Sequence, residues 1–432
     1  MMLLLKGGRV IDPANDLDDI RDVLIADGKI KAVDRNIQAA DAVVYDVTGK
    51  IVSPGWIDMH VHLREPGFEH KETIYTGTRA AVAGGITAVA AMPNTNPVAD
   101  NQSVIAFVKD KGRQVGYAKV FPIGAITKGS QGEELAEIGD MYEAGAVAIS
   151  DDGKPVMNGQ LMRLAMEYAR MFDLPVISHA EDLKLANDGF MHEGYVSTVL
   201  GFRGIPSVAE EAMVARDLLL AQMTDSRLHI AHVSTKGAVE MIREAKKRGI
   251  PVTAEVTPHH LTLTDEAVQS FDTSTKVNPP LRAREDQEAL LQGLVDGTID
   301  VIATDHAPHA GEEKEVEFAY APFGLIGLET MVPLVVDRLV HQGRLTWKDA
   351  IAKVTVNPAR ILGLELGTLT VGQAADITVI DPEKVARVDK ERFYSMARNT
   401  PFDGWDLKGW PVMTIVDGRV LMEDGRLVDT GR

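Results

Sequence analysis

The residues best suited to chemistry lie in one short stretch, from Trp56 to Arg64, which carries two histidines two positions apart. The apolar residues around His60 and His62 predict a buried strand, and residues i and i+2 of a strand face the same side. The two imidazoles therefore point to a common position, where they suit a divalent metal such as zinc. Arg64 shares this parity and adds a guanidinium fork of the kind that binds carboxylates through two hydrogen bonds.

The composition restricts what can hold such a metal and what can bind beside it. The chain of 432 residues contains no cysteine, so any metal must be held by histidines and carboxylates, and disulfides are excluded. The hydrophobic share of 45% and charged share of 25% are typical of a soluble globular protein. With no long apolar run and no secretory leader, we expect a cytoplasmic protein without membrane contact. The net charge of −18 argues against a nucleic-acid partner.

The elements that position these residues alternate between short apolar strands and longer helical segments, which predicts a parallel sheet. Strands are expected at 55–60, 86–92, 119–125, 146–150, 175–179, 228–232, 251–256 and 299–304. Helices are expected around 73–84, 102–112, 133–144, 159–172, 207–222, 236–248 and 285–296. Ser207 and Glu210 have the spacing of a capping box at a helix start. Eight such units predict an α/β protein built on a (β/α)8 TIM-like barrel.

Both ends of the chain have a different pattern, in which valine and isoleucine alternate with polar residues and turns. The same turn dipeptide, typical of tight hairpins, occurs as Asp27-Gly28 and again as Asp417-Gly418. We therefore expect the two termini to meet in one small β-sandwich. The predicted parts are residues 1–53 and 365–432 for the sandwich and 54–364 for the barrel.

Side chains that can bind metals recur at the predicted strand ends, where barrel enzymes place their chemistry. Eight of the 12 histidines fall there, namely His60, His62, His179, His232, His259, His260, His306 and His309. Strand four ends in Asp151 and Asp152, and strand eight ends in Asp305. Four histidines with two aspartates indicate two metals that share a bridging carboxylate, as in hydrolytic two-metal sites.

Some of the nearby histidines are expected to have other roles. His259 and His260 are adjacent, so at most one can face the barrel mouth, and we place both outside the ligand set. His229 precedes His232 by three positions and therefore has the opposite parity. It is expected to pack outside the barrel.

A set of motifs spread over nearly the whole chain resembles a known family. They are Asp58-Met59-His60-Val61-His62-Leu63-Arg64-Glu65-Pro66-Gly67, Met92-Pro93-Asn94-Thr95, Ser178-His179-Ala180-Glu181-Asp182, Ile230-Ala231-His232-Val233-Ser234, Val277-Asn278-Pro279-Pro280-Leu281-Arg282, Thr304-Asp305-His306-Ala307-Pro308-His309 and Pro322-Phe323-Gly324. Together they resemble the bacterial dihydroorotases of the amidohydrolase superfamily. The paired histidines alone would indicate only the superfamily, whereas the Leu63–Gly67 and Asn278–Arg282 runs favour dihydroorotase within it.

The resemblance implies a role for each matching residue. The metal ligands would be His60, His62 and Asp305 for the more buried zinc, and His179 and His232 for the second, with Asp152 as the bridge and Asp151 as the alternative. The second zinc could be only partly occupied, because aspartate is shorter than the carboxylated lysine found in many superfamily members. Asp305 would be the catalytic base. The substrate would be bound by His62, Arg64, Asn94 and His309 near its carboxylate, and by Asn278 and the backbone of Phe323 and Gly324 around its ring.

The implied reaction is the reversible conversion of N-carbamoyl-L-aspartate to L-dihydroorotate and water, a step of pyrimidine biosynthesis. Two alternatives remain at this point: another cyclic-amide hydrolase such as an allantoinase or hydantoinase, and a non-catalytic partner of aspartate transcarbamoylase. We also expect a homodimer, with possible association with aspartate transcarbamoylase. Residues 311–321 carry four charged residues in succession, Glu312 to Glu315, and form either a mobile lid over the site or a solvated loop.

Overall fold

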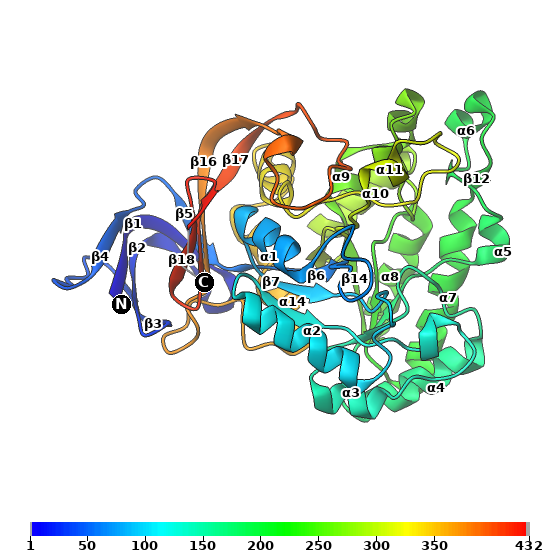
Figure 1. The fold of residues 1–432 in the computed structure, drawn as a ribbon, viewed down its shortest axis with the longest axis horizontal. Coiled ribbons are helices and arrows are strands. Elements are labelled where there is room, and N and C mark those ends of the chain that lie inside the picture. The colour runs from blue at the N-terminus through cyan, green and yellow to red at the C-terminus, as the bar shows by residue number, and fades with distance from the viewer. Residues whose placement is uncertain (1, 429–432) are drawn as a thin grey trace.

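The computed structural model describes residues 2–428, a mixed α/β protein in which parallel strands alternate with helices (Figure 1). All eight strands expected between 54 and 364 are present: β6 Trp56–Val61, β7 Ile86–Ala91, β8 Lys119–Pro122, β9 Ile149–Ser150, β10 Val176–Ser178, β13 Leu228–Ile230, β14 Val252–Val256 and β15 Val301–Ile302. The expected helices are α1 Ile74–Ala83, α2 Gln102–Val115, α3 Ile138–Ala144, α4 Gly159–Arg170, α7 Ser207–Thr224, α8 Lys236–Lys247 and α10 Arg284–Val295.

The parallel strands form two sheets whose edges are linked. The strand orders are β6-β7-β8 and β15-β14-β13-β10-β9. An isolated parallel bridge between Gly124 and Ile149 links the β8 side to β9, and a second between Val61 and His306 links β6 to the segment after β15. Because all these strands run in parallel, the residues that follow them emerge at one end of the assembly. The chemistry-bearing strand ends of the sequence are thereby brought together.

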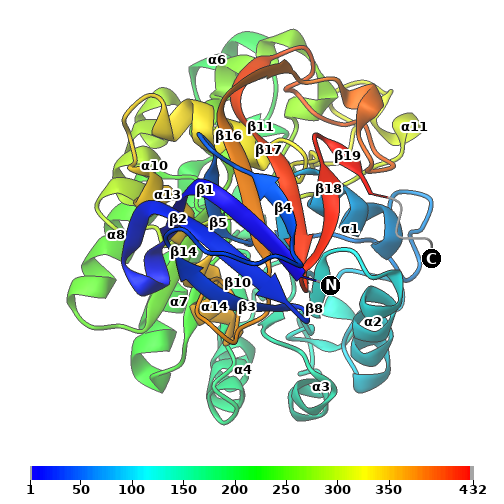
Figure 2. The same cartoon turned by 90° about the vertical axis from the view of Figure 1, so that its left-hand side faces the viewer.

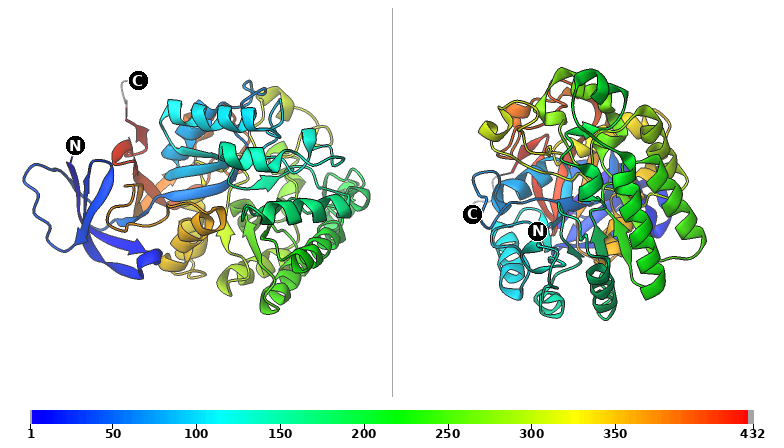
Figure 3. Two further views of the ribbon diagram at one scale, coloured as in Figure 1. Left: turned by 90° about the horizontal axis from the view of Figure 1, so that it is seen from below. Right: turned by 90° about the vertical axis from the view of Figure 1, so that its right-hand side faces the viewer.

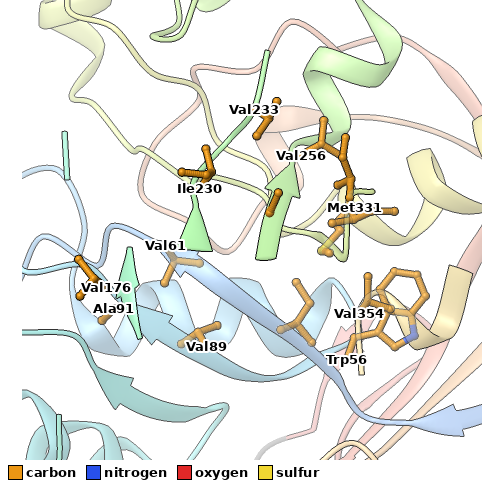
Figure 4. Packing of buried hydrophobic residues seen from close by; sticks show 14 of the residues in the cluster. Trp56, Val61, Val89, Ala91, Val176, Ile230, Val233, Val256, Met331 and Val354 are labelled. Carbon is orange, nitrogen blue, oxygen red and sulfur yellow. The ribbon is translucent and has the colours of Figure 1, made fainter. Parts of the chain in front are cut away.

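The main hydrophobic core lies between these strands and the helices that cover them (Figure 4). Trp56 and Val61 of β6 are 1% and 0% exposed, and Ile230 and Val256 of the neighbouring strands are also fully buried. Met331 packs into the same cluster from α12 (Met331–Val335). Packing of apolar residues on the strands against the helices holds the strand ends rigidly in place.

Helix α7 begins at Ser207 as predicted, but the predicted capping box is wrong. Pro206 occupies the cap position, and no side chain caps the helix. Glu210 is buried and turns toward the loop after β13, where its carboxylate accepts hydrogen bonds from the backbone N–H groups of Ser234 and Thr235 at 2.9 and 3.2 Å. Those buried N–H groups need an acceptor, and this need outweighs local helix capping.

Strands from both chain ends join in a single nine-stranded sheet, shown at the front in Figure 2 and projecting from one side in Figure 3. Its order is β19-β18-β17-β16-β5-β1-β2-β3, and β4 pairs with β1. The bounds are β1 Met2–Asp12, β2 Leu17–Ala26, β3 Lys29–Asp34, β4 Val43–Asp46, β5 Ile51–Pro54, β16 Ile377–Arg387, β17 Asp406–Val416, β18 Arg419–Glu423 and β19 Arg426–Leu427. The pairing of β5 with β16 joins the two ends, as Val52 lies opposite Val379.

Shorter elements complete the chain. They are α5 Leu183–Ala186, β11 Met191–His192, α6 Tyr195–Leu200, β12 Gly204–Ile205, α9 Pro258–Thr262, α11 Gly311–Lys314, α13 Trp347–Ala352 and α14 Val356–Leu362. Single turns of tighter helix occur at Pro13–Asn15, Lys128–Ser130, Asp265–Ser270, Thr273–Thr275 and Lys390–Arg392, and a wider turn at Val336–Val340 continues α12. Several of these elements lie in the loops that follow the parallel strands and surround the candidate site.

The two predicted Asp-Gly turns are confirmed, and they pack against each other. Asp27-Gly28 connects β2 to β3 and Asp417-Gly418 connects β17 to β18, and all four residues have positive φ. A Cβ atom on Gly418 would lie only 2.8 Å from the Cα of Gly28. Glycine is therefore required at 418 both for its backbone conformation and for this close approach.

We predict that Gly418→Ala destabilises the protein more than the matched change Gly425→Ala. Gly425 also has positive φ, 77° against 69° for Gly418, but it has no atom near its missing Cβ. Both variants should lose about 1–2 kcal/mol to the left-handed conformation, and Gly418→Ala about 1–3 kcal/mol more to displacement of the facing turn. Midpoints of urea unfolding measure the difference. Equal midpoints would show that the contact between the turns adds nothing.

Candidate metal centre and active site

The residues that follow the parallel strands converge into two groups of potential metal ligands. The first group is His60 and His62 from the end of β6 with Asp152 and Asp305, and the second is Asp152 with His179 and His232. Within each group the ligand atoms lie within 4.8 Å of one another. Three ligand distances in the first group are His62 Nε2 to Asp305 Oδ1 at 2.9 Å, His60 Nε2 to Asp305 Oδ1 at 3.5 Å and His60 Nε2 to Asp152 Oδ2 at 3.3 Å.

Asp152 belongs to both groups and presents a different oxygen to each. Its Oδ2 faces the histidines of β6, whereas its Oδ1 lies 3.4 Å from His179 Nδ1 and 3.2 Å from His232 Nε2. The neighbouring Asp151 is directed elsewhere, since its carboxylate accepts hydrogen bonds from the backbone N–H groups of Ile126 and Thr127 at 2.8 and 3.0 Å. The geometry therefore favours Asp152 over Asp151 as the carboxylate shared between the two ligand groups.

The charge and donor pattern of the cluster fit divalent cations. Burial alone would raise the pKa of Asp152, but the charge of His60 and hydrogen bonds from His179 lower it well below the usual range. Likewise, burial would lower the pKa of His60, but the charges of Asp152 and Glu255 raise it well above the usual range. His60 Nε2 is fully buried and has no hydrogen-bond partner among residues 2–428. Histidine nitrogens and carboxylate oxygens that face one point, where a positive charge would stabilise them, are the ligands expected of a metal centre.

A buried carboxylate behind the first group orients its ligands. Glu255 on β14 is 0% exposed, and its Oε1 lies 2.5 Å from His60 Nδ1 and accepts from the backbone N–H of His232 at 3.2 Å. Its role was not predicted from the sequence, although a lone carboxylate in an apolar strand was a usable sign. The expectation that His229 packs outside the barrel is wrong: its Nε2 lies 3.2 Å from Glu255 Oε2, because a buried carboxylate needs further donors.

Asp58 is a second supporting carboxylate, and its role was not predicted from the sequence either. It is completely buried and accepts from Thr304 Oγ1 at 2.5 Å, from Thr304 N at 3.1 Å and from His60 N at 3.2 Å. These bonds join the end of β6 to the residue before Asp305. Burial raises the pKa of Asp58 to about 7. Asp58 therefore fixes the relative positions of two ligand-bearing segments.

The adjacent histidines His259 and His260 lie outside both ligand groups, as expected. His260 Nδ1 lies 2.7 Å from Thr257 Oγ1, and its Nε2 lies 3.0 Å from the carbonyl oxygen of Pro279. Both rings are buried. His260 thus links the end of β14 to the loop that carries Asn278.

A cavity of about 620 Å³ opens directly above the cluster. Its walls include all of the predicted substrate-binding residues: His62, Arg64, Asn94, Asn278, His309, Phe323 and Gly324. Asp152, His179 and Asp305 also line it. The structure therefore brings the predicted metal ligands and the predicted substrate contacts to one site.

Arg64 and Asn94 have hydrogen-bond donors that the protein leaves free. Arg64 Nε donates to the carbonyl of Pro308 at 3.1 Å, and its two Nη groups have no protein partner in the described chain. Asn94 Oδ1 lies 2.8 Å from His62 Nδ1, which leaves the amide NH2 free among the same residues. By contrast, His309 uses Nε2 against the carbonyl of Phe323 at 2.8 Å. Free donors beside a metal centre suit an anionic substrate group.

Comparison with known proteins agrees with this site. Residues 49–238 match the profile "Dihydro-orotase-like", and residues 319–422 match "Amidohydrolase family". Among solved structures, the L-hydantoinase (dihydropyrimidinase) of Arthrobacter aurescens superposes with a TM-score of 0.90 at 27% identity, covering 99% of this chain and 97% of that one. The fold and the histidine–aspartate cluster define an amidohydrolase.

Curated relatives narrow the class further. A dihydroorotase of Pelotomaculum thermopropionicum is 63% identical over 98% of this chain and 99% of its own length. A dihydroorotase of Syntrophotalea carbinolica is 57% identical over 97% and 99%, respectively. The chain belongs to the dihydroorotase family.

We predict that Asp152→Ala loses metal from the His179–His232 group before the other group. The first group keeps His60, His62 and Asp305, whereas two histidines alone hold a cation poorly. Anomalous diffraction at the metal edge and elemental analysis measure occupancy at each position.

Lys154→Ala is the matched control, since Lys154 lines the same cavity but lies outside both ligand groups. It should keep its metal, and bicarbonate during preparation should change nothing. Metal loss in Lys154→Ala equal to that in Asp152→Ala would refute the shared-aspartate assignment.

Proposed function

We propose that this protein is a zinc-dependent dihydroorotase that reversibly converts N-carbamoyl-L-aspartate to L-dihydroorotate and water in pyrimidine biosynthesis. The observation that carries the proposal is the position of free donors on Arg64 and Asn94 in the cavity that opens onto the two ligand groups. A cyclic amide with a carboxylate substituent needs both features. The naming of close relatives as dihydroorotases supports the same substrate.

The metal would be held by His60, His62, Asp152 and Asp305 at one position and by Asp152, His179 and His232 at the other. We propose two zinc ions per subunit, because the ligands are nitrogen and carboxylate groups in a chain without cysteine. The second ion is partly occupied if the short Asp152 side chain reaches it poorly. When bound, such ions polarise a carbonyl group and make water more acidic.

Asp305 is the catalytic acid–base in this proposal. Burial would raise its pKa, but the charge of His60 and a hydrogen bond from His62 lower it, so Asp305 is a carboxylate near neutral pH. In ring opening, water adds to the ring amide carbonyl and the carbon–nitrogen bond breaks. Asp305 takes a proton from the attacking water and delivers it to the leaving ring nitrogen. In ring closure, Asp305 takes the proton of the attacking ureido nitrogen and returns it to the departing hydroxyl, which leaves as water.

The wall of the cavity would hold the substrate by both ends. Arg64 and Asn94 bind the carboxylate that does not react, and His62 orients Asn94 through the bond between Nδ1 and Oδ1. Asn278 and the backbone of Phe323 and Gly324 contact the pyrimidine ring. His309 also binds this carboxylate, after its ring N–H breaks the hydrogen bond to the carbonyl of Phe323 and turns to the substrate. Fixing both ends sets the reacting atoms at attack distance.

Two alternatives are less well supported. A hydantoinase or allantoinase would share the fold and metals, as the similarity to the Arthrobacter aurescens structure illustrates. It would not need donors for the non-reacting carboxylate that dihydroorotate carries on its ring. A non-catalytic partner of aspartate transcarbamoylase would not need a complete ligand set. Ring opening of dihydroorotate by the purified protein, compared with hydantoin and allantoin, distinguishes the three.

We also propose the finer architecture expected from the sequence. The two bridges between the parallel sheets support one closed (β/α)8 barrel over 54–364. The nine-stranded sheet encloses its own core, with Leu5, Val23 and Ile377 fully buried, which supports a small β-sandwich of residues 1–53 and 365–432. A crystal structure tests both.

Two proposals on partners and location go with this function. We propose a homodimer that can associate with aspartate transcarbamoylase, and sizing of the protein alone and with that enzyme tests both. No helix within residues 2–428 is long and apolar enough to cross a bilayer. This finding is compatible with the cytoplasmic location that we propose, which cell fractionation tests.

Asp305→Asn should lower kcat by about 100-fold or more in both directions, because an amide cannot carry the proton. Metal analysis of the same sample separates this effect from the loss of a ligand. Activity within about tenfold of the wild type, or about 1.4 kcal/mol of barrier, would exclude Asp305 as the proton carrier.

Arg64→Lys should lower kcat/KM for dihydroorotate by about 10- to 100-fold, because lysine keeps the charge but loses the two-pronged contact. The control substrate is 5,6-dihydrouracil, the same ring without the carboxylate. Both proteins should hydrolyse it equally well or equally poorly. Unchanged dihydroorotate kinetics would remove Arg64 from the carboxylate site.

A further inference from the structure

Residues 311–324 are held against residues 273–276 by two buried lysines that point in opposite directions between the segments. Lys276 follows the turn at Thr273–Thr275, and Lys314 ends α11. Their exposed fractions are only 3% and 8%. Neither ammonium group forms an ion pair with a carboxylate of residues 2–428, although buried lysines ordinarily need such a partner. Their contacts show what stabilises them instead.

Lys276 reaches from its own segment into the segment that follows α11. Its Nζ donates to the carbonyl oxygens of Phe318 and Ala319, both at 2.8 Å. Three aromatic rings surround the ammonium, with ring centres 5.0 Å away for Phe190, 5.7 Å for Phe318 and 4.9 Å for Phe323. Hydrogen bonds and cation–π contacts together replace the water that the ammonium loses.

Lys314 makes the reverse contact. Its Nζ donates to the carbonyl of Thr273 at 3.0 Å and to that of Pro322 at 2.7 Å. The Oγ1 of Thr273 in turn donates to the carbonyl of Lys314 at 2.7 Å. Burial lowers the pKa of Lys276 to about 8, and burial with the nearby charge of Lys276 lowers that of Lys314 to about 7. The two segments are therefore joined by reciprocal ammonium-to-carbonyl bonds, here called the lysine clasp.

The clasp ends on three consecutive residues that line the cavity above the metal ligands. Pro322 accepts from Lys314, the ring of Phe323 lies over the ammonium of Lys276, and Gly324 N donates to the carbonyl of Lys276 at 2.8 Å. Pro322 and Phe323 thus contact the two ammonium groups directly, and Gly324 is bonded to the backbone of Lys276. Elsewhere the segment is more open, as the 80% exposure of Tyr320 shows.

We propose that Lys276 and Lys314 are positioning residues. They hold residues 322–324, which form one wall of the cavity, in the position required to contact the ring of a cyclic amide. The inference rests on the proposed function for the identity of that ring. The sequence left open whether residues 311–321 form a mobile lid or a solvated charged loop. A segment anchored by two buried ammonium groups fits neither description. Neither lysine contacts the metal ligands, so the effect is confined to the ring end of the substrate.

The test compares Lys276→Met and Lys314→Met with the wild type as intact, metal-loaded protein. Methionine keeps the length and the apolar contacts of the stem but loses the ammonium. Lys276→Arg is the conservative variant, and Lys348→Met is the matched control, since Lys348 pairs at the surface with Asp16. Readouts are kcat and KM for dihydroorotate, metal content, and hydrogen exchange of peptides covering 311–324.

Each methionine variant should raise KM by about tenfold and speed exchange in 311–324. The wall contacts the substrate ring equally in the ground and transition states, and the ring lies away from the metal ligands. A displaced wall should therefore change kcat and metal content little. Lys276→Arg should restore most of the KM, and Lys348→Met should match the wild type.

Unchanged KM despite faster exchange would overturn the proposal, as would an equal fall in kcat and metal content. If Lys276→Met does not fold, Lys314→Met and Lys276→Arg decide by the same criteria. If the wild type does not open dihydroorotate, the proposed function fails. The clasp is then judged by exchange alone, and unchanged protection of 311–324 in both methionine variants would refute it.

Discussion

A buried carboxylate, Asp152, and a partly buried one, Asp305, face four histidines and impose the constraint on which the rest of the structure depends. Both are held as anions at the ends of the parallel strands, where uncompensated charge is strongly unfavourable. Histidine donors arranged around shared positions reduce this cost, and a divalent cation bound between them would offset it further. This requirement explains why five strand ends, those of β6, β9, β10, β13 and β15, must meet within a few ångströms, and hence why the strands beneath them are so tightly packed.

A layer of further buried carboxylates transmits that requirement into the scaffold. Glu255 is bonded to His60 and His229, and Asp58 connects the end of β6 to Thr304. Each of these groups is saturated with donors from at least two segments, so none can move alone. In such a network the histidine rings are oriented before any ligand binds, which is the condition for precise metal geometry.

The loop beside the site also contains buried charged groups that are stabilised by several partners, but these groups are positively charged. Lysine ammonium groups at 276 and 314 are saturated by carbonyl oxygens and aromatic faces, and they hold the loop that forms one wall of the cavity. Lys119 at the start of β8 pairs with Asp376 and Asp417 at 2.6 and 2.8 Å. That contact fixes the sheet formed by the chain ends to the catalytic part.

The order and approximate positions of the parallel strands and their helices could be predicted from the sequence, because apolar periodicity is a local property. Their extents could not: the strand expected at 146–150 is only Ile149–Ser150. The sequence by itself also determined the ligand types, because the chain has no cysteine and the spacing of His60 and His62 sets their common face. Only the tertiary structure directed Asp151 to the backbone of Ile126 and Asp152 toward the histidines, placed His229 beside Glu255, and turned Glu210 away from its own helix. In each case the deciding partner is a buried group at least 24 residues away in the chain: a backbone N–H for Asp151 and Glu210, and the carboxylate of Glu255 for His229. Parity along a strand shows which way a side chain can point, but only the assembled fold shows which unsatisfied group it must meet.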